Sequence, residues 1–386
     1  MNKDRFNQLL AAMIGDGAGV SDLLFLPGRP AQLDHSGRLR PYAGDLIASL
    51  VTPELTRQLA DILMEGNQLL ADNLRQTGSC DCSYALPGQA RFRANIYQQS
   101  GQLALVLRKL SNTVPQLDKL GLPPVVAEIV KEHAGIVFVT GATGAGKTTT
   151  LAAILNELNR TQDIHVVTLE DPIEYVHPPA RASFSQRELG KDFFSFPVGL
   201  RAALRQAPKA ILVGEIRDRE TMEVALTAAE TGHVVFSTLH TINATQTVNR
   251  ILGMFHRDEE QLTRQRLADT LRWVVSQQLV RKVEGGLHLV TEVMGSNMRT
   301  REAIILGESE KRNLHDIIEG SVTPWGWHSF EQSLLKAYQA RLITEETAVI
   351  HSSHKSSMRQ ALDKSKHTHS AASHSTVDRS DCFISA

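Results

Sequence analysis

Residues 135–150, GIVFVTGATGAGKTTT, contain the segment that decides the fold of this 386-residue chain. A run of β-branched and aromatic residues enters a loop of small residues, and the loop opens into a helical pattern. The loop, GATGAGKT at 141–148, satisfies the pattern G-x-x-x-x-G-K-[ST] between a strand and a helix, as that motif requires. Its backbone N–H groups can curl around an anion, with the positive end of the helix behind them. The sequence therefore predicts a site for the phosphates of a nucleoside triphosphate.

The residues of this loop have separable roles. The predicted ATP-binding residues are Gly141, Ala142, Thr143, Gly144, Ala145, Gly146, Lys147, Thr148 and Thr149. We expect Lys147 to reach the β- and γ-phosphates and the Thr148 hydroxyl to take one Mg²⁺ position. A glycine-rich turn without a ligand is the alternative, and the correct flanking pattern disfavours it.

Acidic residues stand at the ends of two further predicted strands. These ends are TLEDPIEYVH at 168–177 and ILVGE at 211–215. A phosphate-loop enzyme needs an acid on Mg²⁺ and a carboxylate that orients or deprotonates the attacking water. The ends of neighbouring parallel strands face the crevice where the nucleotide lies. We expect Glu215 to act on Mg²⁺ and Glu174 to face the γ-phosphate, with Glu170 and Asp171 shaping the turn. The alternative, in which these acids only cap loops, is open when they are considered alone.

Two histidines bracket another predicted strand in ETGHVVFSTLHT, residues 230–241. His233 precedes the strand and His240 follows it. Both are candidate catalytic residues that sense the phosphate or Mg²⁺, although a histidine at a strand end is often structural. Spacing alone does not decide between these interpretations.

The rest of the pattern predicts a chain of several parts. Residues 1–110 have the pattern of an α+β domain, with an amphipathic helix near Phe6 and a hairpin whose loop contains Gly101. Residues 111–124 form a predicted linker. From 125 to 350 strands alternate with helices, which indicates a mainly parallel α/β sheet, and the pattern is helical from 244 onward. Residues 351–386 are rich in serine and hold five histidines. We expect a disordered, solvated tail there rather than a metal site.

Composition excludes several function classes. The formal net charge is −1, so nucleic acid and anionic lipid are not expected as main partners. The cysteines, Cys80, Cys82 and Cys382, form neither a disulfide framework nor a zinc motif, which fits a reducing cytoplasm. No run of 18 apolar residues predicts a transmembrane segment. The apolar patch near the start is short and suits an amphipathic helix, so secretion is not expected.

Taken together, the motifs resemble those of a known family. GATGAGKT, TLEDPIEYVH, LRAALRQAPKAILVGEIRDRET and TAAETGHVVFSTLHT are similar, in order and spacing, to the Walker A, Asp, Walker B and His boxes of secretion-type ATPases. With SDLLFLPGRPAQL, ARFRANIY, TVNRILGMF and SQQLVRKVEGG, the chain resembles the type IV pilus retraction ATPases, the PilT/PilU family, over nearly all of residues 5–350.

The resemblance implies an architecture and an activity. It implies a PAS-like domain, 1–110, before a RecA-like P-loop ATPase domain, 125–350, in a homohexamer that binds ATP and Mg²⁺ between the two domains. It implies a motor for pilus retraction and twitching motility, cytoplasmic and peripheral at the inner membrane. Its partners would be the pilus platform protein and a paralogous retraction ATPase, with no nucleic acid.

The resemblance also assigns residues. Glu174 matches the catalytic glutamate, Glu215 the Walker B glutamate, and His233 and His240 the His-box positions. Arg91, Arg93 and Arg108 match the arginines that act in trans on a neighbouring subunit's γ-phosphoryl group. Without the resemblance, these arginines would be assigned to a solvated strand face.

Two departures keep alternatives open. Ala207 and Lys209 stand where the family usually has two acids, and MRTREAIILGES, 298–309, matches the retraction signature only in part. The alternatives are an accessory PilU-like nucleotide-binding subunit that docks on a separate motor, and a secretion or conjugation ATPase. The extension and type II secretion branch carries a four-cysteine zinc element, whereas no cysteine lies between 83 and 381 here.

Overall fold

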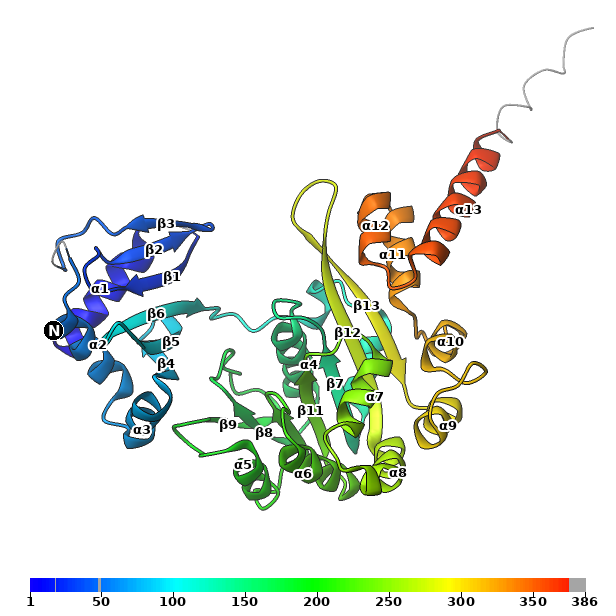
Figure 1. Cartoon of the computed structure of the whole chain (residues 1–386), viewed down its shortest axis with the longest axis horizontal. Helices are drawn as coiled ribbons and strands as arrows, with labels where there is room; N and C mark the ends of the chain where they lie inside the picture. Colours follow the sequence, from blue (N-terminus) through cyan, green and yellow to red (C-terminus); the bar gives the residue numbers. More distant parts are fainter. Residues whose placement is uncertain (18, 48–49, 375–386) are drawn as a thin grey trace, which may run out of the picture. The chain divides into compact units, whose positions relative to one another are not determined.

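The computed structural model describes residues 1–17, 19–47 and 50–374, whose helices and strands are labelled in Figure 1. The chain divides into two compact units. The first unit comprises Met1–Pro115, Leu155–Ile216 and Glu223–Ala225. The second comprises Gln116–Ile154, Arg217–Met222 and Leu226–Ala386. The N-terminal residues thus belong to the same compact unit as residues 155–216, which lie in the region predicted to be the ATPase domain. The domain limits at 110 and 125 remain a prediction.

The first unit begins with a six-stranded antiparallel sheet and three helices. These are α1 (Lys3–Gly15), β1 (Val20–Phe25), β2 (Gln32–His35), β3 (Arg38–Pro41), α2 (Pro53–Met64), α3 (Gln68–Thr77), β4 (Ser79–Leu86), β5 (Ala90–Gln99) and β6 (Gln102–Leu110). The strand order is β3-β2-β1-β6-β5-β4. The predicted amphipathic helix and the hairpin around Gly101 are both confirmed. The segment after Pro53 forms two helices rather than one, because Glu65 and Gly66 adopt positive φ between them.

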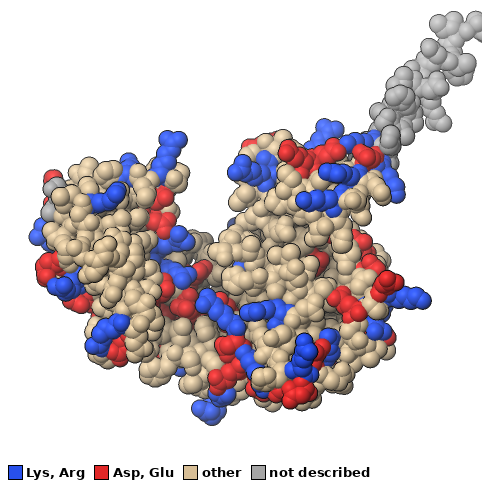
Figure 2. All heavy atoms as spheres, viewed as in Figure 1, with Lys and Arg blue, Asp and Glu red and all other residues tan. Residues whose placement is uncertain are grey.

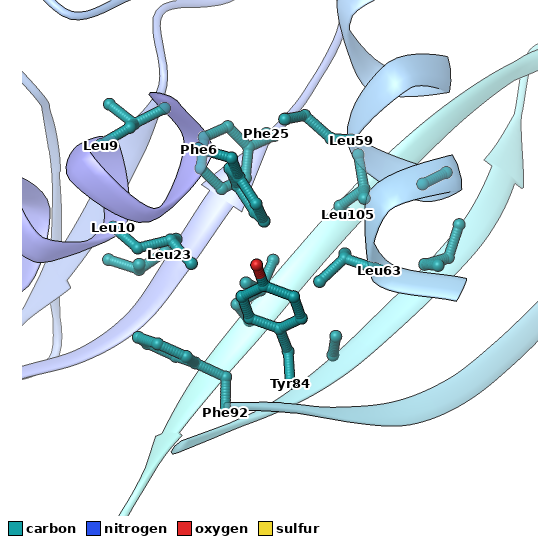
Figure 3. Packing of buried hydrophobic residues seen from close by; sticks show 14 of the residues in the cluster. Phe6, Leu9, Leu10, Leu23, Phe25, Leu59, Leu63, Tyr84, Phe92 and Leu105 are labelled. Carbon is teal, nitrogen blue, oxygen red and sulfur yellow. The ribbon is translucent and has the colours of Figure 1, made fainter. Parts of the chain in front are cut away.

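The core of this sheet is shown in Figure 3. Phe6 of α1 and Leu59 of α2 are fully buried and converge on Tyr84 of β4 and Phe92 of β5 (Figure 3). The Tyr84 hydroxyl still finds a partner, since it donates to Asn7 Oδ1 at 2.7 Å. Each buried large apolar side chain contributes about 1.5–3 kcal/mol, so this cluster fixes α1 and α2 on the sheet.

The remaining elements of the first unit carry the acidic segments. They are β8 (His165–Glu170), β9 (Ser183–Glu188), α5 (Phe196–Ala203) and β10 (Ala210–Val213). β8 pairs in parallel with both β9 and β10. β8 and β10 are fully or almost fully buried, as expected for strands covered on both faces.

The second unit begins with short 3₁₀ helices and continues into the phosphate loop. Its elements are η1 (Leu117–Lys119), η2 (Pro124–Lys131), β7 (Gly135–Thr140), α4 (Lys147–Thr161), α6 (Arg219–Glu230), β11 (Val234–Leu239), α7 (Ala244–Leu252), η3 (Arg257–Glu259), α8 (Glu260–Thr270), β12 (Leu271–Arg281), β13 (Leu287–Gly295), α9 (Met298–Leu306), α10 (Leu314–Glu319), α11 (Phe330–Gln339), α12 (Glu345–His351) and α13 (Lys355–His374). The second half of α4 and three residues of α6 belong to the first unit. The seven-stranded sheet has the order β13-β12-β7-β11-β10-β8-β9. The predicted class, α/β with a smaller α+β part before it, is confirmed.

The expectation of continuous helices after residue 244 is wrong. β12 pairs in parallel with β7 and in antiparallel with β13. Val274, Val275 and Val280 are buried and β-branched, which suits a strand covered by neighbours. Gly285 and Gly286, both with positive φ, lie between the two strands. Its β-branched residues and its pairing with β7, far away in sequence, together make this segment a strand.

The expectation of a disordered tail is wrong for residues 355–374, which form α13. Met358 and Leu362 of α13 are buried against Phe330 and Leu334 of α11. The few apolar residues of this serine-rich segment are spaced so that they meet α11. Residues 375–386, also part of the predicted tail, lie outside the described residues.

Acidic and basic side chains are intermixed on the face shown in Figure 2. In the described part of the chain, no helix is long and apolar enough to cross a membrane.

Candidate active site

The phosphate loop of the second unit is built on a fully buried strand, β7. Gly141, Gly144 and Gly146 have φ of 141°, 82° and 89°, a region that side chains disfavour. Lys147, only 9% exposed, opens α4 and donates through Nζ to Gly141 O at 2.9 Å and Ala142 O at 3.1 Å. The ammonium group thus lies against the loop whose N–H groups form the anion nest. These residues fit a polyphosphate.

β12 supports this loop from behind. A Cβ atom on Gly141 would lie 2.4 Å from Gln277 O, so only glycine fits there. Gln277 Nε2 donates to Thr150 Oγ1 at 2.8 Å, and Thr140 Oγ1 donates to Ser276 Oγ at 3.0 Å. Sequence reasoning missed Ser276 and Gln277, because it expected a helix there. The apolar, β-branched run around them was the available signal.

The two predicted histidines lie at opposite ends of one strand, β11. β11 pairs in parallel with β7 from Val234↔Gly135 to Leu239↔Thr140. His240 therefore follows β11 at the carboxyl end of the strands, where the phosphate loop also begins. His233 lies at the amino end, where its backbone O accepts from Gly135 N and its Nδ1 lies 3.0 Å from Ala228 O.

The six residues of β11 separate His233 from His240 by about 20 Å. His233 therefore lies away from the phosphate loop of its own chain, and its catalytic role stays a prediction.

The acidic segments of the first unit follow the carboxyl ends of two neighbouring parallel strands. β8 and β10 run in parallel with Leu169 opposite Val213, and Gly214 N donates to Leu169 O at 2.8 Å. Glu170 and Glu215 therefore lie at the carboxyl ends of two neighbouring strands. The structure thus places both predicted acidic segments together, with Glu174 on the turn that follows Glu170.

Glu170 is a buried positioning residue. It is 8% exposed, and its Oε1 accepts from Thr168 Oγ1 at 2.6 Å and Gln186 Nε2 at 3.2 Å. Burial raises its pKa to about 7, which these hydrogen bonds only partly offset. Gln186, missed by the sequence analysis, also donates to Tyr175 O at 2.8 Å and accepts from His177 N at 2.9 Å. The pair therefore fixes the turn that carries Glu174.

The same turn is held from the N-terminal sheet by Arg91. This half-buried guanidinium donates to Ile173 O at 2.8 Å and Glu174 O at 3.3 Å. Glu188 completes the contact, since it accepts from Ile173 N at 3.3 Å and Ser83 N at 3.0 Å. Arg91, predicted to act in trans, is thus engaged with the Glu174 turn of its own chain.

The other two arginines contact acids of their own sheet. Arg93 pairs with Asp81 at 3.4 Å, and Arg108 pairs with Asp22 at 2.8 Å. The Arg108 side chain is 69% exposed. Its exposed position is compatible with the trans role, which stays a prediction for both.

The assigned side chains thus come from both units. Lys147, Thr148, Thr149 and His240 belong to the second unit, and Glu174 and Glu215 to the first.

The comparisons with known proteins agree with this geometry. A family model described as "Type II/IV secretion system protein" matches residues 64–382. The chain is 36% identical over 332 residues to the type IV pilus retraction ATPase PilT of Pseudomonas aeruginosa. The match covers 86% of this chain and 93% of that protein. It is 35% identical over 347 residues to the type IV pilus ATPase PilU of the same organism, which covers 90% of this chain and 88% of that protein.

Among solved structures, that of the pilus retraction motor PilT with bound ADP matches with a TM-score of 0.80. The identity is 36%, and the match covers 90% of this chain and 96% of that chain. The chain therefore belongs to the type II/IV secretion system protein family, and its similarity to the pilus retraction ATPases extends over most of its length.

Proposed function

We propose that this chain is an ATP-hydrolysing motor that drives type IV pilus retraction. The observation that carries the proposal is the phosphate loop, in which three glycines with positive φ and the buried Lys147 form an anion cradle at the start of α4. Its fold and length match those of a retraction motor.

The assigned residues have distinct tasks in ATP hydrolysis. Lys147 and the loop N–H groups bind the β- and γ-phosphates, and Glu174 orients or deprotonates the attacking water. Glu170 does not suit that second role, since it is buried and hydrogen-bonded within the turn. Thr148 and Glu215 offer the hard oxygen donors that Mg²⁺ prefers, and they would hold that ion, which neutralises phosphate charge. His240 follows β11 at the phosphate-loop edge and would respond to phosphate occupancy.

The motor acts as a homohexamer in this proposal. Arg93 or Arg108 of one subunit would complete the site of its neighbour, and Arg91 would hold the Glu174 turn within each subunit. The assembly would be cytoplasmic and peripheral at the inner membrane, where the platform protein of the pilus receives its motion.

A second candidate function is an accessory subunit that binds nucleotide and docks on a paralogous retraction ATPase. The observation in its favour is the partial match of MRTREAIILGES, residues 298–309, to the retraction signature. These residues include α9, which belongs to the second unit and carries none of the assigned nucleotide ligands.

ATP turnover by the purified full-length chain, with the native mass measured in parallel, tests the proposal. We expect a hexamer that hydrolyses ATP, and cells without the gene that lose twitching. The inactive Lys147→Ala chain should fail to restore it. A hexamer without turnover, whose loss matters only when the paralogue is weakened, would support the accessory function instead.

A further inference from the structure

A hollow in the second unit gathers acidic and histidine side chains, at α10, α11 and the start of α13. Its volume is about 390 Å³. The titratable residues that line it are Glu292, Glu308, His315, Asp316, Glu331 and His354. None of the described residues that line it is a lysine or an arginine. Neighbouring carboxylates repel one another, and a bound metal ion would relieve that repulsion.

Three side chains, two of which line this hollow, have the arrangement of metal ligands. His315 and Glu319 are one turn apart on α10, with Nε2 and Oε1 3.6 Å apart, and Glu331 lies on α11. One ligand atom from each lies within 4.8 Å of the other two. Ligands about 2.1 Å from Zn²⁺ are at most about 4.2 Å apart, so small side-chain rotations would close the site.

Surrounding groups orient both carboxylates. Ser329 Oγ donates to Glu319 Oε1 at 2.8 Å. Ser353 N and His354 N donate to Glu331 Oε1 at 3.0 and 3.3 Å. Within the described residues, the Glu331 carboxylate accepts these hydrogen bonds through Oε1, so Oε2 faces no such donor and can bind a ligand. Metal ligands in proteins are commonly held in this way by outer hydrogen bonds.

A second histidine lies close by, in the segment that sequence analysis assigned to a solvated tail. The ring of His354 lies beside that of His315, with centroids 4.8 Å apart. Glu292, 5% exposed, also lines the hollow, and Ala244 N donates to its Oε1 at 2.8 Å. Two imidazoles and two carboxylates form a mixed nitrogen and oxygen set that suits Zn²⁺ and its neighbours, whereas Mg²⁺ and Ca²⁺ prefer oxygen alone.

We propose that His315, Glu319 and Glu331 bind one divalent transition-metal cation of the Zn²⁺ class, with His354 as the fourth donor. The bound ion would join α10 and α11 to the start of α13, which otherwise packs through Met358 and Leu362. The site would therefore stabilise the docking of α13. It is independent of the nucleotide site, whose assigned donors for Mg²⁺ are all oxygens.

Zinc binding by the tag-free full-length chain tests the proposal. The protein is stripped with a chelator, kept in excess Mg²⁺ and titrated with ZnCl₂ in competition with a chromophoric chelator. We expect one Zn²⁺ per chain at micromolar affinity or tighter, and at least tenfold weaker binding by His315→Ala. Equal binding by the wild type and His315→Ala would overturn the site.

Matched variants separate this site from other histidines and from structural effects. His351→Ala changes a histidine at the end of α12 that does not line the hollow, and it should bind like the wild type. A chain with His367, His369 and His374 all changed to alanine should also bind normally. Glu331→Gln keeps an acceptor for the backbone N–H groups, so its fold should persist while its zinc affinity falls. Loss of zinc in either histidine control, with His315→Ala unaffected, would assign the metal elsewhere.

Two physical signatures complete the test. Zn²⁺ should raise the melting temperature of the wild type by several degrees and leave that of His315→Ala unchanged. Co²⁺ in the same site should give visible d–d bands without a thiolate charge-transfer band. A thiolate band would show that cysteines bind the metal, and it would contradict the proposal.

Discussion

A Cβ atom on Gly141 would lie 2.4 Å from the carbonyl oxygen of Gln277, so the first glycine of the phosphate loop touches the backbone of β12. The contact is with backbone, so no side-chain rotation can relieve it. The phosphate loop and β12 therefore constrain each other.

Gly141→Ala should displace the loop and lower stability. The φ of 141° adds strain to the close contact, and we expect a loss of about 2–4 kcal/mol together with most of the nucleotide affinity. Denaturant unfolding and nucleotide titration measure both effects. Gly232→Ala is the control, since it also has positive φ but meets no atom within 4 Å. Equal losses in the two variants would exclude the contact as the cause.

Glu174→Gln should keep ATP affinity while hydrolysis slows by about 10² to 10⁴, the span expected for a lost general base. Glu215→Gln should lose activity chiefly through weaker Mg²⁺ dependence, which a Mg²⁺ titration of the rate detects. Wild-type turnover by Glu174→Gln would show that a group other than Glu174 serves as the base.

Mixing experiments should separate Arg91 from Arg108. An Arg108→Ala chain keeps its own Glu174 turn, so a Lys147→Ala partner should restore turnover by supplying the missing arginine. An Arg91→Ala chain loses the contacts to Ile173 O and Glu174 O within itself, so the same partner should not restore it. Steady-state ATPase rates of the mixtures decide the matter. Rescue of Arg91→Ala would refute the role within one chain.

Glu170 should make stability depend on pH. Its folded pKa of about 7 lies above the ordinary value of 4.5, so the folded state holds the proton more tightly than the unfolded state. The free energy of unfolding should therefore fall by up to about 3 kcal/mol as pH rises from 4.5 through 7. Glu292, also with a pKa raised to about 7 by burial, adds the same trend. Glu170→Gln should make the slope shallower, and an unchanged slope in unfolding curves across pH would reject this assignment.

The exposed face of α9 should transmit motion rather than support catalysis. Arg301 pairs with Asp269 of α8 and Glu302 lies 3.7 Å from Arg312, both at half-exposed positions where a pair is worth about 0–1 kcal/mol. Replacing Arg301 and Glu302 with alanine should leave ATP turnover nearly unchanged and abolish twitching. Loss of both activities together would make α9 part of the catalytic core.

The sequence alone determined the parts that depend on local patterns. GATGAGKT between a strand and a helix fixed the phosphate loop, because glycine is needed where φ is positive. Acids at the ends of β8 and β10 were found because parallel strands present their carboxyl ends together. The helix at Phe6 and the hairpin at Gly101 followed from apolar periodicity and a turn residue.

Only the tertiary structure decided the features that depend on distant segments. The fold decided that β12 pairs with β7, and α13 is ordered because Met358 and Leu362 reach α11. The register of β11 separated His233 from the phosphate loop, and the fold directed Arg91 to the Glu174 turn of its own chain. His315 and His354, 39 residues apart in the chain, meet only after α10 and α13 are placed. Periodicity encodes which face of an element is buried, whereas the partner that covers it is chosen by packing across the whole chain.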